Sequence, residues 1–173
     1  MTTAPSPDSS STGSSTESST GSSTDLHAEI EVDATPAQTW ALVSDVRRMP
    51  EWSPQVRRTF VPGGAVRLGS RMVNLNHRGW MHWPTQAKVV RFEPHREVAF
   101  RVVENRTVWS FTLEPLDGGT RTRIVHRRET PEGVSPLSLG LTKVAFGGVP
   151  AFTDELRAGM QRTLERMRDT LAS

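Results

Sequence analysis

Two side chains that could take part in chemistry, His126 and Arg128, lie two positions apart in the sequence. They belong to the segment Arg121–Glu129, which has the composition of a β-strand. Alternate residues of a strand share a face. One face would therefore carry Thr122, Ile124, His126 and Arg128, and the other would carry Arg121, Arg123 and Arg127.

Each of these two residues has a functional and a structural interpretation. His126 could be a general acid or base, because the ordinary pKa of histidine is about 6.5. It could equally be a strand histidine whose ring is hydrogen-bonded to a neighbouring hydroxyl. Arg128 could pair with a carboxylate or phosphate of a ligand. Alternatively, it could bridge to Glu97 or Glu129 at the end of the sheet.

Other kinds of site are not expected. The chain has no cysteine, which excludes disulfides, thiolate metal sites and a Cys nucleophile. No two of its five histidines, His27, His77, His82, His95 and His126, have helical i,i+4 spacing, so we expect no metal site. Gly147-Gly148 lacks the lysine of a phosphate-binding loop. We therefore expect no cofactor.

Aromatic and methionine side chains supply candidates for an apolar site. Trp109, Phe111 and Leu113 share one face of their segment, which we expect to point inward. Further inward candidates are Trp83, Phe100 and Met160. These side chains could line a ligand cavity or simply pack a core. Trp40 and Trp52 are expected to anchor short helices to the sheet.

The elements that must position these residues can be read from periodicity and turn signals. Strands are expected at 26–32, 55–61, 69–77, 80–92 (which could bend at Pro84), 97–103, 107–113 and 121–129. Two short helices are expected at about 36–45 and 46–51, with Thr35 and Asp45 as their caps. The connections between the strands after the second helix are short, which favours antiparallel pairing. The stretch 131–150 is left open as a short helix or a loop.

The C-terminal segment from Phe152 to Leu171 is expected to be one long helix. Its apolar residues are spaced by three and four positions and fall on one face: Phe152, Leu156, Met160, Leu164, Met167 and Leu171. Burying six such side chains contributes roughly 9–18 kcal/mol gross. Only a sheet is large enough to cover this face, so we expect a two-layer α+β domain.

Residues 1–25 contain ten Ser and six Thr and almost nothing apolar, so we expect a disordered tail before a domain at 26–173. The start lacks the basic and apolar stretches of a secretion signal, and no long apolar run is present, which predicts a soluble, cytoplasmic protein without a membrane span. The basic residues are spread along the chain and are expected on the outer faces of strands and helices, so no nucleic-acid partner is expected. The chain could be a monomer or a homodimer.

Several short motifs resemble the polyketide cyclase/dehydrase branch of the START-like, or SRPBCC, superfamily. They include Thr35-Pro36, Ser44-Asp45-Val46, Pro50-Glu51-Trp52-Ser53-Pro54, Leu113-Glu114-Pro115, Gly118-Gly119-Thr120 and Gly159-Met160. The resemblance covers residues 26–172. It implies a helix-grip fold, with a curved antiparallel sheet of about seven strands wrapped around the C-terminal helix, and a cavity between the two.

In the 69–77 strand, either Met72, Asn74 and Asn76 or Val73, Leu75 and His77 could face inward, and the recurrence of Asn74 in similar proteins favours the first set. The ligand-binding candidates are thus Asn74, Trp83, Phe100, Trp109, Phe111, His126, Arg128 and Met160.

Three functions are compatible with these features. The first is binding of a hydrophobic lipid, polyketide or isoprenoid-like molecule. The second is a cyclase or dehydrase in which His126 would be the catalytic candidate. The third is a protein-binding module, which would have an exposed apolar patch and a filled interior.

Overall fold

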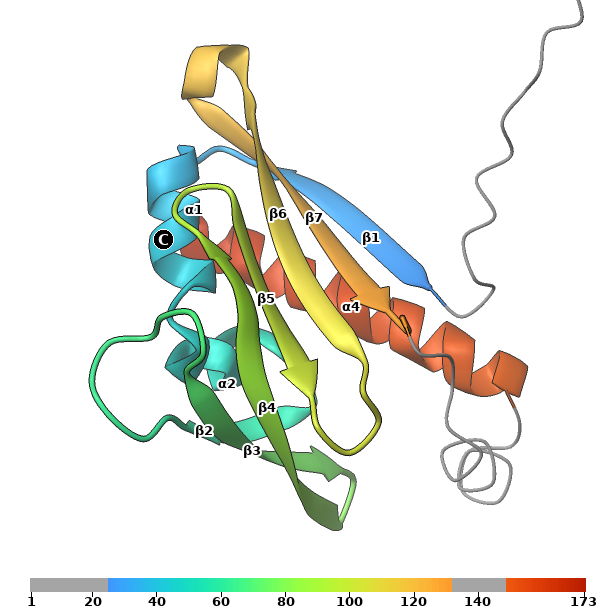
Figure 1. The fold of residues 1–173 in the computed structure, drawn as a ribbon. Coiled ribbons are helices and arrows are strands. Elements are labelled where there is room, and N and C mark those ends of the chain that lie inside the picture. Colours follow the sequence, from blue (N-terminus) through green and yellow to red (C-terminus); the bar gives the residue numbers. More distant parts are fainter. Residues whose placement is uncertain (1–24, 132–148) are drawn as a thin grey trace, which may run out of the picture.

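The computed structural model describes residues 25–131 and 149–173. In this part of the chain, seven strands form one antiparallel sheet in the order β1-β7-β6-β5-β4-β3-β2 (Figure 1). The strands are β1 (Leu26–Val32), β2 (Val56–Phe60), β3 (Arg71–Arg78), β4 (Met81–Glu93), β5 (Glu97–Val102), β6 (Val108–Leu116) and β7 (Arg121–Glu129). Each strand from β3 to β7 pairs with the one before it, and β1 completes the sheet beside β7. The expected antiparallel sheet of about seven strands is confirmed.

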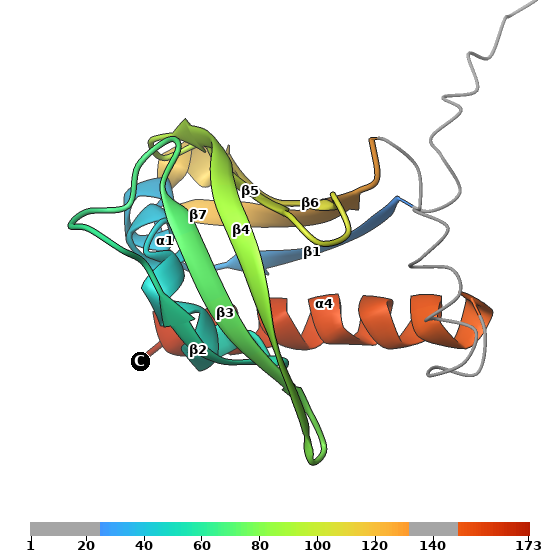
Figure 2. The ribbon, with the colours of Figure 1, turned by 60° about the horizontal axis from the view of Figure 1, so that its bottom comes forward.

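Helix α4 (Val149–Leu171) runs along the concave side of the curved sheet (Figure 2). It begins three residues before the expected start at Phe152, whose side chain lies outside the described residues. Leu164 and Met167, in its C-terminal half, are 0% exposed and belong to the main apolar core. The periodicity of this segment therefore identified both the helix and its buried face.

The connection from β1 to β2 consists of α1 (Pro36–Val43), the short 3-10 helix η1 (Val46–Arg48) and α2 (Met49–Trp52). Thr35 and Gln38 form a reciprocal capping box at the start of α1. The Asp45 side chain accepts a hydrogen bond from the Arg47 backbone N–H at the start of η1. Both caps are where the sequence placed them. The Trp40 ring meets Phe92 of β4 edge-on, with centroids 5.0 Å apart, so Trp40 anchors α1 to the sheet.

Pro84 lies inside β4, which continues through it as one strand. Pairing between β4 and β5 begins only at Ala87, whereas β3 pairs with β4 back to Met81. Pro84 therefore stands where β4 has a neighbour on one side only, and its missing N–H costs no ladder bond. Residues 81–86 and their β3 partners form a ribbon that extends beyond β5, and β2 pairs with β3 along part of it (Figures 1 and 2).

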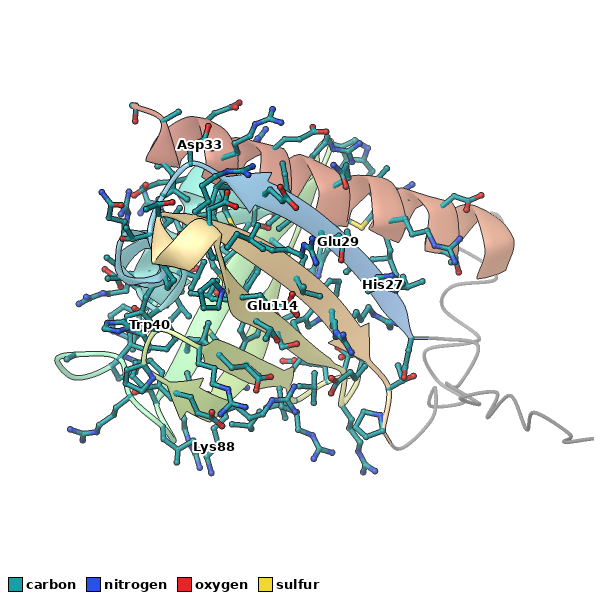
Figure 3. All side chains as sticks on the ribbon, turned by 90° about the horizontal axis from the view of Figure 1, so that it is seen from above. His27, Glu29, Asp33, Trp40, Lys88 and Glu114 are labelled. Carbon is teal, nitrogen blue, oxygen red and sulfur yellow. The ribbon has the colours of Figure 1, made fainter. Side chains whose placement is uncertain are left out.

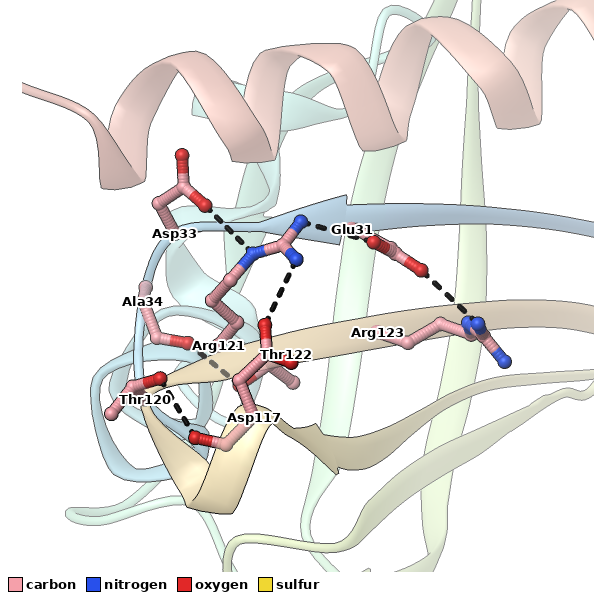
Figure 4. A network of polar contacts seen from close by, with 8 residues as sticks. All are labelled: Glu31, Asp33, Ala34, Asp117, Thr120, Arg121, Thr122 and Arg123. Carbon is pink, nitrogen blue, oxygen red and sulfur yellow. Dashed lines mark hydrogen bonds and ion pairs between the residues drawn. The ribbon is translucent and has the colours of Figure 1, made fainter.

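Residues 1–24 and 132–148 lie outside the described residues, and with them most of the expected tail and most of the 131–150 stretch. Asp25, which the sequence assigned to the tail, accepts a hydrogen bond from the Thr130 N–H at 2.9 Å. Asp25 is therefore linked to the residue that follows β7. The last strand, β7, is also linked to β1 and η2 (Asp117–Gly119) on the outer face. There Arg121 pairs with Glu31, Asp33 and Asp117 (Figure 4).

Candidate functional site

A cavity of about 560 Å³ lies between the concave face of the sheet, α2 and α4. All eight positions that the sequence selected line it: Asn74, Trp83, Phe100, Trp109, Phe111, His126, Arg128 and Met160. They come from strands β3 to β7 and from α4, and the curvature of the sheet brings their side chains together. The buried apolar residues form two clusters. The main core contains Leu164 and Met167, while a small cluster of Leu26, Leu156 and Met160 lies farther toward the start of α4.

The structure decides which face of β3 points inward. Met72, Asn74 and Asn76 are buried, whereas Val73 and Leu75 are exposed. The Asn74 side-chain oxygen accepts a hydrogen bond from the Thr59 hydroxyl at 2.8 Å. No described residue accepts a hydrogen bond from its amide nitrogen, so these N–H groups are available to the cavity.

His126 is buried and its ring is held on two sides. Its Nδ1 lies 2.9 Å from the backbone carbonyl oxygen of Ser110. A carbonyl oxygen can only accept, so Nδ1 carries the proton and Nε2 of the neutral ring is an acceptor. The ring stacks on Phe111, with centroids 4.1 Å apart. Burial lowers the pKa of His126 from 6.5 to about 4, although the bond to Ser110 opposes this shift.

The expected partner of His126 was a hydroxyl, and this was wrong. The ring donates to a main-chain carbonyl, while the Ser110 hydroxyl is buried with no hydrogen-bond partner among the described residues. Ser110 and His126 belong to neighbouring strands, and the bond follows from the pairing of Phe111 with His126. Nε2 has no hydrogen-bond partner within the described part of the chain, so a ligand could donate to it.

Arg128 lies beside Trp109, its cross-strand neighbour, with the guanidinium carbon 5.8 Å from the indole ring centroid. Burial lowers the pKa of this guanidinium, and the nearby charge of Asp25 opposes the shift. The expected bridge to Glu97 or Glu129 was wrong. Among the described residues both carboxylates pair with Arg91, on the outer face of the sheet, because Arg128 faces the opposite side.

The indole ring of Trp109 is fixed by a chain of hydrogen bonds. Its Nε1 donates to the Thr107 hydroxyl at 3.1 Å, and that hydroxyl donates to Asn105 Oδ1 at 2.8 Å. The polar edge of the ring is therefore satisfied within the protein, which leaves its apolar faces for His126, Arg128 and the cavity.

Several lining residues were missed or only partly understood from the sequence. Trp52 anchors α2 by packing edge-on against Phe111, with centroids 5.4 Å apart, and it also lines the cavity. Its indole N–H is buried and has no partner among the described residues. Arg78 and Glu155 form an ion pair at 2.9 Å that links the end of β3 to α4 at the cavity.

Helix α4 contributes more than Met160. Its lining residues Glu155, Leu156, Gly159, Met160 and Thr163 are spaced as one helical face. The four-residue spacing of Leu156 and Met160 could have indicated this whole face of the helix. The apolar pattern alone did not include its polar and small residues, Glu155, Gly159 and Thr163.

Two other kinds of feature, a metal site and a membrane-spanning helix, were also considered. In residues 25–131 and 149–173, no three His, Asp or Glu side chains come together as a metal ion would require. No helix of that part is both long and apolar enough to cross a bilayer.

Comparison with known proteins gives a family and a fold. The family model described as "Polyketide cyclase / dehydrase and lipid transport" matches residues 23–172. No curated protein matches the chain. Among solved structures, a START superfamily protein from Mycobacterium smegmatis has a TM-score of 0.66 at 12% identity, with 86% of this chain and 97% of that chain covered.

Two further structures are similar. The Zhui aromatase/cyclase from Streptomyces sp. R1128 has a TM-score of 0.62 at 16% identity, covering 86% of this chain and 93% of that one. A polyketide cyclase-like protein from Corynebacterium glutamicum has a TM-score of 0.57 at 23% identity, covering 86% and 91%. At these identities the likeness concerns the fold alone.

Proposed function

Because the chain belongs to the polyketide cyclase/dehydrase and lipid transport family and has the START-like helix-grip fold, we propose that it binds one largely apolar small molecule between the sheet and α4. The observation that carries this proposal is the cavity. Its volume of about 560 Å³ falls within the range of roughly 300–1,000 Å³ that is usual for small-molecule sites. A lipid, a polyketide or an isoprenoid-like molecule would suit its apolar walls.

The lining supports such a ligand because most of the surface that it exposes to the cavity is apolar. Trp52, Phe100, Trp109, Phe111 and Met160 offer broad apolar surfaces. Transfer of apolar ligand surface from water to these walls would drive binding, at roughly 25 cal/mol for each Å² buried.

Three of the polar lining residues carry groups that would fix the orientation of the ligand. His126 Nε2 is an acceptor, so it would select a ligand hydroxyl or N–H. The Asn74 amide N–H groups are donors and would suit a carbonyl or ether oxygen. The Arg128 guanidinium would favour an oxygen-rich or acidic end of the molecule.

A screen of apolar compounds against the full-length protein tests this proposal. Native mass spectrometry should find complexes with one ligand per chain, and the same ligands should raise the thermal unfolding temperature, since they bind only the folded state. If a broad set of lipids, polyketides and isoprenoids produced neither effect, the proposal would be wrong. The third function considered, a protein-binding module, would have a filled interior, and the cavity is evidence against it.

A cyclase or dehydrase is the second candidate, because His126, Arg128 and Asn74 converge on the same cavity. A pKa of about 4 makes the His126 imidazole a weak base at neutral pH, so it suits hydrogen bonding better than proton abstraction. If a polyketide substrate is turned over, unchanged turnover in His126→Ala would remove His126 from the mechanism.

A further inference from the structure

Charge is unevenly distributed along the chain. The segment from Trp52 to Phe92, which includes β2, β3 and most of β4, contains seven Lys or Arg and no Asp or Glu. The whole chain has 21 basic and 19 acidic residues, so the remainder holds 14 basic and all 19 acidic ones. One end of the sheet is therefore strongly cationic, while the rest of the protein is acidic on balance.

The same segment carries nearly all of the exposed large apolar side chains. Among the described residues there are seven of these, and six belong to it: Phe60, Leu68, Val73, Leu75, Trp80 and Met81. Trp80 is 91% exposed, at the tip of the ribbon formed by β3 and β4. A large apolar group in water is unfavourable, and a cluster of them marks an interaction surface.

Strand register places the two kinds of side chain on one surface, the β2–β4 outer face, which we define as Arg58, Phe60, Arg71, Val73, Leu75 and Lys88. Phe60 is paired with Val73, Arg58 with Leu75, and Arg71 with Lys88. All six side chains are exposed and lie on the face of the sheet opposite the cavity. In Figure 3, Lys88 projects away from α4.

Three arginines on the rest of the outer face are neutralised by carboxylates. Arg91 pairs with Glu97 and Glu129, while Arg121 and Arg123 share Glu31. By contrast, Arg58, Arg71 and Lys88 form no ion pair within the described residues, because no carboxylate occurs on their strands near them. Their positive charge is therefore available to an anionic surface.

The ribbon tip connects this surface to the cavity. Met81 is exposed and also lines the cavity, so the ribbon carrying Trp80 forms part of the rim. Because the ribbon extends beyond β5 (Figure 2), Trp80 can enter another phase without unfolding the sheet.

We propose that the β2–β4 outer face and Trp80 dock on the surface of an anionic lipid bilayer. Basic residues are attracted to anionic headgroups, and tryptophan prefers the interface between headgroups and acyl chains. A nucleic acid would satisfy the charges but would leave Phe60, Val73 and Leu75 in water. Docking brings the cavity rim to the lipid surface. If the cavity binds an apolar ligand, as proposed above, the bilayer is a source of that ligand.

Vesicle co-sedimentation of the full-length, ligand-free protein tests this inference. The protein should bind vesicles of phosphatidylcholine mixed with phosphatidylglycerol, and it should bind pure phosphatidylcholine much less. The double variant Arg71→Glu/Lys88→Glu should weaken binding at least about tenfold, since each basic residue near such a surface contributes about a factor of five. The matched control Arg162→Glu/Arg166→Glu makes the same change in charge on exposed positions of α4 and should bind like the wild type.

Acyl chains carrying bromine provide a second readout, because they quench tryptophan fluorescence on contact. Quenching should occur in the wild type and be lost in Trp80→Ser. Trp80 is exposed, whereas the other four tryptophans are buried or half-buried. The proposal is overturned if anionic vesicles do not bind at low salt, if both charge variants bind equally, or if duplex DNA binds while vesicles do not. Arg71 and Lys88 do not line the cavity, so failure here leaves the ligand-binding proposal intact.

Discussion

The imidazole of His126 lies nearly parallel to the phenyl ring of Phe111, with ring centroids 4.1 Å apart and an angle of 9° between the planes. The two residues are cross-strand partners in β7 and β6. Stacking fixes the plane of the imidazole, and the hydrogen bond from Nδ1 to Ser110 fixes its rotation within that plane. The ring therefore presents one defined acceptor, Nε2, among apolar neighbours.

Burial of neutral His126 should make the protein sensitive to acid. In the unfolded chain this histidine takes up a proton near pH 6.5, whereas in the folded protein it does so only near pH 4. The unfolded state thus binds more protons between these values, and stability falls as pH decreases through this window. His126 should account for a loss of about 3 kcal/mol in the free energy of unfolding.

Urea unfolding of the wild type and His126→Phe at several pH values measures this contribution. The difference between the two proteins should change by that amount from pH 7 to pH 4, while the control His95→Gln at an exposed position should follow the wild type. Parallel curves for wild type and His126→Phe would show that the ring is protonated normally in the folded state.

The fixed acceptor should also discriminate between two probes of nearly equal shape. 2-Naphthol can donate a hydrogen bond to Nε2, whereas 2-methoxynaphthalene cannot. We expect about tenfold tighter binding of the naphthol by isothermal titration calorimetry, the value of one well-formed buried hydrogen bond. In His126→Phe the two probes should bind alike. If wild type and variant preferred 2-naphthol to the same extent, a group other than His126 would accept the hydrogen bond from its hydroxyl.

The two halves of α4 should differ in their contribution to stability. Leu164 lies in the solid core, so Leu164→Ala should lower the free energy of unfolding by an amount toward the upper end of about 2–5 kcal/mol. Leu156 borders the cavity and has fewer packing partners to lose, so Leu156→Ala should cost at least ~1 kcal/mol less. Chemical denaturation compares them, and equal losses would mean that the start of the helix is packed as tightly as its end.

Much of this arrangement could be predicted because it depends on local periodicity. Alternation placed Trp109, Phe111, His126 and Arg128 on the inner face, and helical spacing placed Met160 on the face of α4 that meets the sheet. The caps at Thr35 and Asp45 depend on neighbours within three residues, which the sequence displays directly.

Features that depend on register could not be predicted. Both faces of β3 carry residues that could be buried. Only the pairing of β3 with β2 and β4 determines that Asn74 faces inward. The bond from His126 to the Ser110 carbonyl requires the β6–β7 register. The bulges at Val56/Arg58 and Val89/Arg91 leave no clear mark in the sequence. The size of the cavity follows from sheet curvature, which no local pattern encodes.

Gly159 is the position at which ligand binding in the cavity can be blocked with the least disturbance of the fold. It lines the cavity on α4, and a Cβ atom built there meets nothing within 4 Å. Gly159→Leu would place a side chain in the open space. It should also stabilise the helix by up to about 1 kcal/mol, because glycine is a poor helix former.

The decisive measurement is the affinity of 2-naphthol for the wild type, Gly159→Leu and the control Ala158→Leu, whose side chain is exposed on the same helix. We expect at least about tenfold weaker binding in Gly159→Leu, together with an unchanged or higher unfolding temperature, and wild-type affinity in Ala158→Leu. Equal affinity in all three proteins would contradict this expectation, because the ligand would then bind outside the cavity.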